Sequence, residues 1–261
     1  MEDVLLCSLL VLLLSEPEVP MDNESDSKTG APIGILACSA EGAALCYRTI
    51  CLEGQKTLGE HMHPEVTMHT HCLGLYMEKL TNEPRNADWQ GVAGLMQSSY
   101  DRLVEAGARV IVCPDNTIHQ AYDLVKQRPG IRWLHIAGQV AELAREKNYA
   151  RLAVLGTRYL MEGPVYGTTL EKYGIEARYP NEDERLRINR VIFSELVNGK
   201  FGVDSRSYFV GVINRLRKEG CHAVVLGCTE IPLLISESDS PIPILDSTRV
   251  LARAALKASQ E

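Results

Sequence analysis

The sequence predicts an α/β protein built from parallel sheets in two similar lobes. Short apolar runs alternate with helical stretches from Pro32 onward, and this alternation is typical of parallel sheets covered by helices. Two segments also repeat one pattern. A helix, a glycine, a valine-rich run and a cysteine occur in this order at residues 89–116 and again at residues 204–230. We therefore expect two related lobes, and we take it as a hypothesis that they face each other.

In the first half of the chain, apolar runs of about six residues predict strands, and longer stretches with helical apolar spacing predict helices. The run 108–113, ARVIVC, has the composition of a strand buried on both faces. Gly107 before it suits the C-terminal cap of a helix. The predicted strands are 33–38, 65–70, 108–113 and 131–136, and the predicted helices are 41–58, 89–107 and 140–148.

The second half of the chain has the same alternation of apolar runs and helical stretches. Gly174, Gly199 and Gly220 each follow a stretch with helical spacing, as expected of helix ends. The run 222–227, HAVVLG, has the composition of a second buried strand. The predicted strands are 151–157, 175–180, 222–227 and 241–248, and the predicted helices are 163–174, 182–199, 204–220 and 249–259.

Composition narrows the class of protein. The net charge of −7 disfavours a general nucleic-acid binder, which usually carries a basic stripe. The eight cysteines are irregularly spaced and form no CxxC pair, so we expect reduced thiols in a cytoplasmic protein rather than disulfides or a zinc ribbon.

The first 31 residues differ from the rest. The apolar run 4–14 is too short to span a bilayer comfortably, and Glu2 and Asp3 precede it where a signal peptide carries basic residues. Residues 16–31 are polar and have the composition of a disordered segment. We expect residues 1–31 to be a disordered extension and the protein to have no membrane partner.

Cys113 and Cys228 occupy matching places in the repeat. Each directly follows a predicted buried strand and precedes turn-forming polar residues. Parallel sheets bind ligands at the carboxyl ends of their strands, so facing lobes would bring one thiol each to a shared cleft. A single cysteine in an apolar run is more often a core residue, as we expect for Cys221. The repeated position is what favours a function for these two.

Two opposed thiols suit proton transfer on both faces of a small molecule. Each lies where a helix is predicted to begin, and a helix N-terminus lowers a thiol pKa. One thiolate would take a proton while the other thiol gives one, which inverts a stereocentre. Asn116, Thr117 and Thr229, with backbone N–H groups, would hold the substrate carboxylate and the developing negative charge.

The segments CPDNTIH at 113–119 and GCTEIPLL at 227–234 resemble the paired signatures of the aspartate/glutamate racemase family, whose members racemise amino acids without pyridoxal phosphate. The similarity includes IGIL at 33–36, YRTI at 47–50, LGTRYLME at 155–162 and the stretch 181–201, and it covers residues 32–257. It implies two lobes related by approximate two-fold symmetry. Residues 32–134 with 245–261 would form the first lobe, and residues 135–244 the second.

The resemblance also implies roles for individual residues. Cys113 and Cys228 would be the two acid–base catalysts, with no cofactor and no metal. The substrate would be aspartate, glutamate or a related amino acid, and the assembly a homodimer. Arg187 would meet the distal carboxylate of an acidic substrate. The residues that would bind the substrate are Ser39, Asn116, Thr117, Thr157, Arg187 and Thr229.

The chain departs from the family at two loops, which leaves substrate choice open. A glycine-rich loop follows the first strand in relatives, where this chain has residues 37–42, ACSAEG. Relatives carry Asn or Ala where this chain has Pro114 and Asp115. Alternatives on the same scaffold are a hydantoin racemase or a maleate isomerase. An alternative of another class is a non-catalytic protein that binds amino acids or senses redox state through its thiols.

Further polar residues are auxiliary candidates. His61, His63, His69, His71 and Cys72 cluster in sequence, but no acidic residue or further cysteine completes a known metal spacing. For His69 or Thr70, contact with the substrate is favoured over metal binding. His119 follows Cys113 closely, and packing is favoured over tuning of that thiol. Glu230 either orients or deprotonates Cys228, or is a first-turn carboxylate favoured by the helix dipole.

Overall fold

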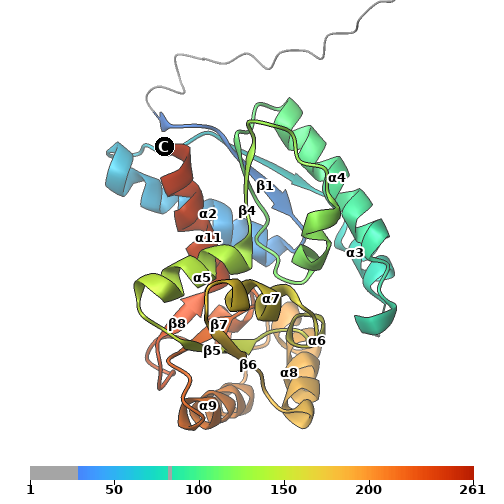
Figure 1. Ribbon diagram of the computed structural model, residues 1–261, viewed down its shortest axis with the longest axis vertical. Coiled ribbons are helices and arrows are strands. Elements are labelled where there is room, and N and C mark those ends of the chain that lie inside the picture. The colour runs from blue at the N-terminus through green and yellow to red at the C-terminus, as the bar shows by residue number, and fades with distance from the viewer. Residues whose placement is uncertain (1–28, 82–83) are drawn as a thin grey trace, which may run out of the picture.

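The computed structural model describes residues 29–81 and 84–261, and it contains two four-stranded parallel sheets (Figure 1). Most of the predicted extension, residues 1–28, lies outside the described residues. The first sheet has the order β2-β1-β3-β4 and the second the order β6-β5-β7-β8. The strands of the first sheet are β1 Ile33–Ala37, β2 Val66–Thr70, β3 Val110–Val112 and β4 Arg132–Leu134; those of the second are β5 Arg151–Leu155, β6 Glu176–Arg178, β7 Ala223–Leu226 and β8 Ile244–Asp246. The two sheets thus share one topology, in which the first strand of each pairs with the second and the third.

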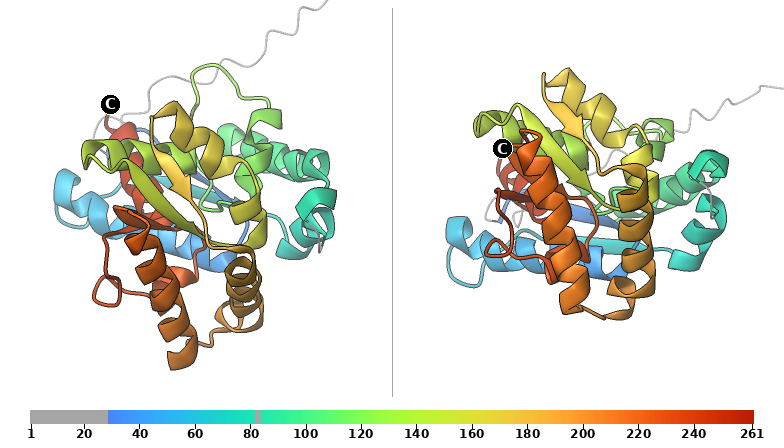
Figure 2. Two further views of the ribbon diagram at one scale, coloured as in Figure 1. Left: turned by 60° about the horizontal axis from the view of Figure 1, so that its bottom comes forward. Right: turned by 90° about the horizontal axis from the view of Figure 1, so that it is seen from below.

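Helices cover both faces of each sheet, as the two turned views show (Figure 2). The longer helices around the first sheet are α2 Ala40–Leu58, α3 Leu73–Leu80, α4 Trp89–Glu105 and α11 Ser247–Ser259. Those around the second are α5 Ile136–Glu146, α7 Val165–Lys172, α8 Glu182–Ser194 and α9 Val203–Lys218. Short elements complete the chain: α6 Arg158–Glu162, α10 Ile231–Leu234 and the 3-10 helices η1 Pro84–Asn86, η2 Ile118–Leu124 and η3 Leu196–Asn198.

The core forms four apolar layers, one on each face of each sheet. On the first sheet, α2 and α11 pack against one face through residues such as Ile50 and Leu251, and α3 and α4 pack against the other. On the second sheet, α5 and α7 cover one face, and α8 and α9 cover the other. The last helix therefore returns to the first sheet, after β8 has completed the second.

The predicted strands and most predicted helices are confirmed within a few residues at each end. Helix α3 has no counterpart in the prediction, and the predicted helix 182–199 divides at Glu195 into α8 and η3. Gly199 follows η3 with a positive φ of 70°, as a left-handed terminal residue should. Of the helices in residues 29–81 and 84–261, none has the length and apolar character needed to cross a bilayer.

Gly34 in the middle of β1 tests the packing between the first sheet and α4. An added Cβ would lie 2.6 Å from Cδ1 of Ile111, 2.9 Å from Cβ of Ala108 and 3.2 Å from Cβ of Leu103 in α4. We expect Gly34→Ala to lower the free energy of unfolding by about 1–3 kcal/mol, because the core must shift to admit the methyl group. Chemical denaturation measures the change.

Gly94 is the matched control, since it is an exposed residue within α4 with no atom within 4 Å of an added Cβ. Gly94→Ala should raise the free energy of unfolding by about 0.5–1 kcal/mol through helix propensity. A Gly34→Ala protein as stable as the parent would contradict tight packing around Gly34.

Candidate active site

The carboxyl ends of the two sheets meet at one cavity of about 100 Å³. The loops that follow β1, β3, β5 and β7 each contribute to its lining, which explains why the polar residues gather there. We call this space the interlobe cavity. It is lined by Cys38, Ser39, Leu73, Met77, Leu80, Asp115, Asn116, Thr117, Ile118, Thr157, Tyr159, Ile192, Phe193, Val197, Gly227, Cys228, Thr229 and Glu230.

Hydroxyl groups join the loops of the two sheets around this cavity. Oγ1 of Thr117, after β3, lies 3.1 Å from Oγ1 of Thr157, after β5. Oγ of Ser39, after β1, lies 3.5 Å from Oγ1 of Thr229, after β7. These contacts connect the loops of the first sheet to those of the second. They also place four hydroxyl groups in the lining of one small cavity.

The Asn116 side chain is fixed by two buried partners. Its Nδ2 donates to Oγ of Ser247 at 2.9 Å, and its Oδ1 accepts from the Tyr166 hydroxyl at 2.8 Å. Ser247 begins α11 and donates in turn to the carbonyl of Leu226 at the end of β7. The amide therefore links the loop after β3 to the second sheet and has a single orientation at the cavity wall.

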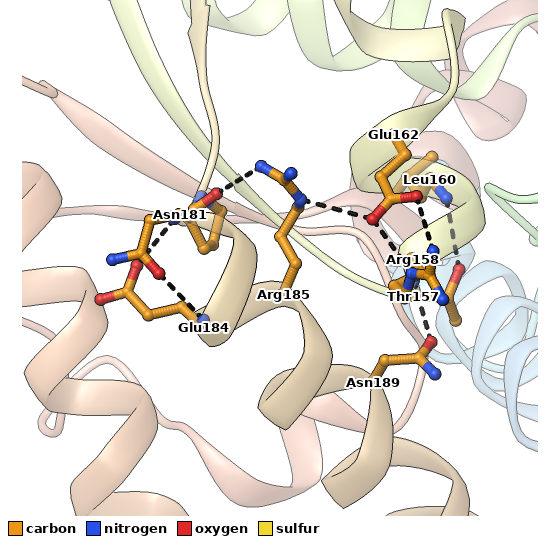
Figure 3. A network of polar contacts seen from close by, with 9 residues as sticks. Thr157, Arg158, Leu160, Glu162, Asn181, Glu184, Arg185 and Asn189 are labelled. Atoms are coloured by element: carbon orange, nitrogen blue, oxygen red, sulfur yellow. Dashed lines mark hydrogen bonds and ion pairs between the residues drawn. The ribbon is translucent and has the colours of Figure 1, made fainter.

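A polar network behind Thr157 orients this part of the lining (Figure 3). Thr157 caps α6 by accepting from the backbone N–H of Leu160, and the N–H of Arg158 donates to Oδ1 of Asn189 at 2.9 Å. Glu162 accepts from Arg158 and forms an ion pair with Arg185. Because Asn189 and Arg185 belong to α8, the network ties the threonine loop to the helix that carries the apolar wall residues Ile192 and Phe193.

Cys228 lines the cavity and is partly exposed. Its Sγ donates to Oε2 of Glu230 at 2.9 Å, and the Thr229 hydroxyl donates to the same oxygen at 2.8 Å. Burial, together with the charge and hydrogen bond of Glu230, raises the pKa of the Cys228 thiol well above its usual range. Cys228 is therefore a protonated thiol held beside a carboxylate acceptor.

Cys113 occupies a different environment. Its side chain is 0% exposed and packs in the apolar layer that contains Met96 and Tyr100. It is not among the described residues that line the interlobe cavity. Burial raises the pKa of its thiol well above the usual range, and the charge of Asp115 raises it further.

The expected lowering of both thiol pKa values is wrong in this structure. The N-terminal turns that follow the cysteines belong to η2 and to the four-residue α10, and short helices supply little dipole. Burial and neighbouring carboxylates outweigh that effect at both sites. Both thiols therefore keep their protons in the protein without substrate.

Asp115 and Cys38 line the cavity, although no role was predicted for either from the sequence. Oδ1 of Asp115 accepts from the backbone N–H of Ile118 at 3.1 Å, and its carboxyl group is hydrogen-bonded to the Cys38 thiol. Burial raises the pKa of Asp115, and the nearby charge of Glu230 adds to the increase. The polar loop after the predicted strand 108–113 could have pointed to Asp115, because an aspartate in a ligand-facing turn is as suited to acid–base catalysis as a thiol.

The other predicted site residues divide into two groups. The structure brings Ser39, Asn116, Thr117, Thr157, Thr229 and Glu230 together with Cys228 in the cavity lining. The Arg187 guanidinium instead stacks on the ring of Tyr208, 3.8 Å from its centroid. Nδ1 of His69 lies 2.9 Å from Oγ of Ser99. Thr70 is exposed. None of these last three is among the described lining residues.

His119 is a packed core residue. Its Nδ1 lies 2.6 Å from the carbonyl of Asp115, and its Nε2 accepts from the backbone N–H of Ile136 at 3.2 Å. Burial lowers the pKa of His119 to about 3, so the ring is neutral. Within residues 29–81 and 84–261, no three His, Cys, Asp or Glu side chains are placed to hold a metal ion.

The outer wall of the cavity is apolar and carries no described lysine or arginine. Its residues come from α3, from α6, and from α8 and η3: Leu73, Met77, Leu80, Tyr159, Ile192, Phe193 and Val197. The charged side chains of the described lining are the two acids Asp115 and Glu230. The cavity lining therefore combines hydroxyl groups from the loops after the strands with apolar contacts from the helices.

Comparison with known proteins gives a consistent result. A family model described as Asp/Glu/Hydantoin racemase matches residues 35–255. A solved Yersinia pestis protein assigned as an Asp/Glu racemase has a TM-score of 0.79 and 32% identity, covering 88% of this chain and 99% of that chain. An aspartate racemase homologue from Pyrococcus horikoshii has a TM-score of 0.75 and 27% identity, covering 88% of this chain and 100% of that one.

The matches to curated relatives cover a smaller share of this chain. A glutamate racemase of Pseudomonas aeruginosa is 21% identical over 159 residues, which is 59% of this chain and 58% of the relative's length. A broad-specificity amino-acid racemase of Bacillus subtilis is 22% identical over 156 residues, which is 59% of this chain and 66% of the relative. This chain therefore matches little more than half of the Pseudomonas enzyme's length.

The contact between Glu230 and Cys228 predicts how the thiol titrates. Glu230→Gln should lower the pKa of Cys228, because it removes a negative charge and keeps an acceptor oxygen near Sγ. The measurement is the pH dependence of iodoacetamide alkylation of the Cys228 peptide by mass spectrometry. The midpoint should move to lower pH in the variant. Glu237→Gln, at an exposed residue on the following loop, is the control and should leave it unchanged. A midpoint that stays in place or rises in Glu230→Gln would contradict the contact.

Proposed function

Because the chain belongs to the Asp/Glu/Hydantoin racemase family, we propose that it is an isomerase that racemises an amino acid without a cofactor. The observation that carries the proposal is the interlobe cavity, where proton-transferring groups from both sheets face one small space. Aspartate, glutamate and related amino acids are the substrates that the resemblance implies, and the lining of the cavity bears on the choice among them. A homodimer and a cytoplasmic location stay predictions.

Racemisation needs a base and an acid on opposite faces of Cα, and the lining supplies candidates from both sheets. Cys228, beside Glu230, would serve one face. The hydroxyls of Thr117 and Thr157 would donate to the substrate carboxylate, and they would stabilise the enolate-like charge that forms when the α-proton leaves. The Thr229 hydroxyl already donates to Glu230. In the two-cysteine form of this mechanism, Cys113 would serve the other face. Its burial beneath the cavity lining weighs against that form.

Two other enzyme functions on the same scaffold can be distinguished from amino-acid racemisation by their substrates and chemistry. A hydantoin racemase would invert a cyclic substrate and leave free amino acids untouched, and a maleate isomerase would use one thiol as a nucleophile on an alkene. The family description includes hydantoin racemases, so hydantoins belong in the first substrate panel. An amino-acid-binding protein would bind without exchanging the α-proton.

Loss of the α-proton signal in heavy water tests the proposal. Purified protein without added cofactor is incubated with single L-amino acids, and chiral chromatography follows on the same samples. We expect the α-proton signal to disappear while the D form accumulates. No exchange with any amino acid in the panel would contradict the proposed function.

Cys228→Ser should reduce kcat for racemisation by about 100-fold or more, because an alcohol is a far weaker acid than a thiol and general acid–base catalysis contributes about this much. Cys72→Ser is the control, because Cys72 is an exposed thiol outside the described cavity lining, and it should keep the parent rate. A Cys228→Ser enzyme with most of its racemisation intact would exclude the thiol from proton transfer.

The apolar outer wall predicts a preference among amino acids. Alanine, leucine or methionine should show a kcat/KM about tenfold or more above that of aspartate, because a second carboxylate would be desolvated there without a cationic partner. Arg187→Ala should leave this ratio unchanged, since Arg187 stacks on Tyr208 outside the described lining. Faster turnover of aspartate, with a selective loss of acidic substrates in Arg187→Ala, would restore the role that the resemblance gave Arg187.

A further inference from the structure

We propose that Asp115, and not Cys113, is the second proton-transferring group opposite Cys228. This assignment rests on the proposed racemase function and deepens it. The two residues are separated only by Pro114, so the sequence pattern alone does not distinguish them. The structure separates them by environment, because the Asp115 side chain is in the lining of the interlobe cavity and the Cys113 side chain lies in the core.

The position of Asp115 suits a group that acts on a substrate. It comes from the loop after β3 of the first sheet, whereas Cys228 comes from the loop after β7 of the second sheet. The charge of Asp115 acts on the Cys228 thiol and on Cys38, which places the carboxyl group within electrostatic reach of both thiols. The N–H of Ile118 holds one carboxylate oxygen, so the orientation of the group is set before a substrate arrives.

The environment also makes Asp115 a better base than an ordinary aspartate. Burial and the charge of Glu230 raise its pKa, and a raised pKa gives a carboxylate more affinity for a proton. Cys38 is hydrogen-bonded to it and supplies a neutral donor beside the charge. Cys113 is 0% exposed, belongs to the apolar layer that contains Tyr76, Met96 and Ile118, and is not among the described residues that line the cavity.

The proton balance closes with these two groups. For one enantiomer, the Asp115 carboxylate takes the α-proton, the electron pair of the broken C–H bond enters the adjoining carboxylate as an enolate, and the Cys228 S–H gives its proton to the opposite face. The product leaves a protonated Asp115 and a Cys228 thiolate. That form accepts the other enantiomer, so the reverse reaction restores the first form, and exchange with solvent does the same.

Three variants test the assignment. Asp115→Asn keeps an oxygen to accept from Ile118 but removes the base, and it should lower racemisation about 100-fold or more. It should still exchange the α-proton of the enantiomer that faces Cys228, with deuterium returned to the same face and no inversion. Cys113→Ala should keep racemisation of both enantiomers near the parent rate. Thermal melts establish that each variant is folded.

Asp115→Cys provides a rescue. A thiol replaces the carboxyl group with another ionisable group, so it should recover racemisation relative to Asp115→Asn, with the pH optimum moved upward because a thiol ionises at higher pH. A merely structural role for Asp115 would not move the optimum in this way.

The outcomes separate the assignment from the function. If the parent racemises and Asp115→Asn does so at the parent rate, or if Cys113→Ala alone abolishes inversion, the assignment is overturned and the racemase proposal stands. If the parent exchanges no α-proton from any amino acid, both are overturned. Exchange without inversion in Asp115→Asn, with an active Cys113→Ala, supports the assignment.

Discussion

Two carboxylates, Asp115 and Glu230, share one small and largely apolar cavity, and the chemistry of the site follows from that confinement. Like charges in a poorly solvated space favour retention of protons on the groups around them. The thiols of Cys38 and Cys228 respond in the same direction, and each keeps its proton while it is hydrogen-bonded to a carboxylate. The site is therefore a set of weak acids that can exchange one proton with a substrate, rather than a pair of free thiolates.

The fold creates this confinement by directing two parallel sheets at each other. Each sheet ends at the cavity, and the loops after β1, β3, β5 and β7 supply the polar residues. The contact between Thr117 and Thr157 and the contact between Ser39 and Thr229 connect the loops of one sheet to those of the other. Helices α3 and α8 add the apolar outer wall, so the polar and the apolar parts of the cavity lining come from different kinds of element.

Much of this arrangement was predictable from sequence because it depends on periodic patterns. Buried strands and the repeated helix–glycine–strand unit located the loops, and the loops contain Cys228, Thr229, Asn116 and Thr117. The side chain that turns toward the cavity after β3 was not predictable, because it depends on the path of the loop through Pro114 rather than on strand alternation. Cys113 continues the buried surface of its strand, and Asp115 is the residue at the cavity. The place of Arg187 also escaped prediction, since its stacking on Tyr208 is a tertiary contact between α8 and α9.

The most direct test of two different groups on opposite faces of Cα is a circular dichroism time course. A single enantiomer of the best substrate is followed in heavy water with the parent protein and no cofactor. We expect the signal to pass through zero, reach the opposite sign and then decay to zero, because the product carries deuterium delivered by the second group and converts back more slowly. A smooth approach to zero, with deuterium appearing equally in recovered substrate and product at early times, would mean that one group serves both faces and would contradict the assignment of two groups.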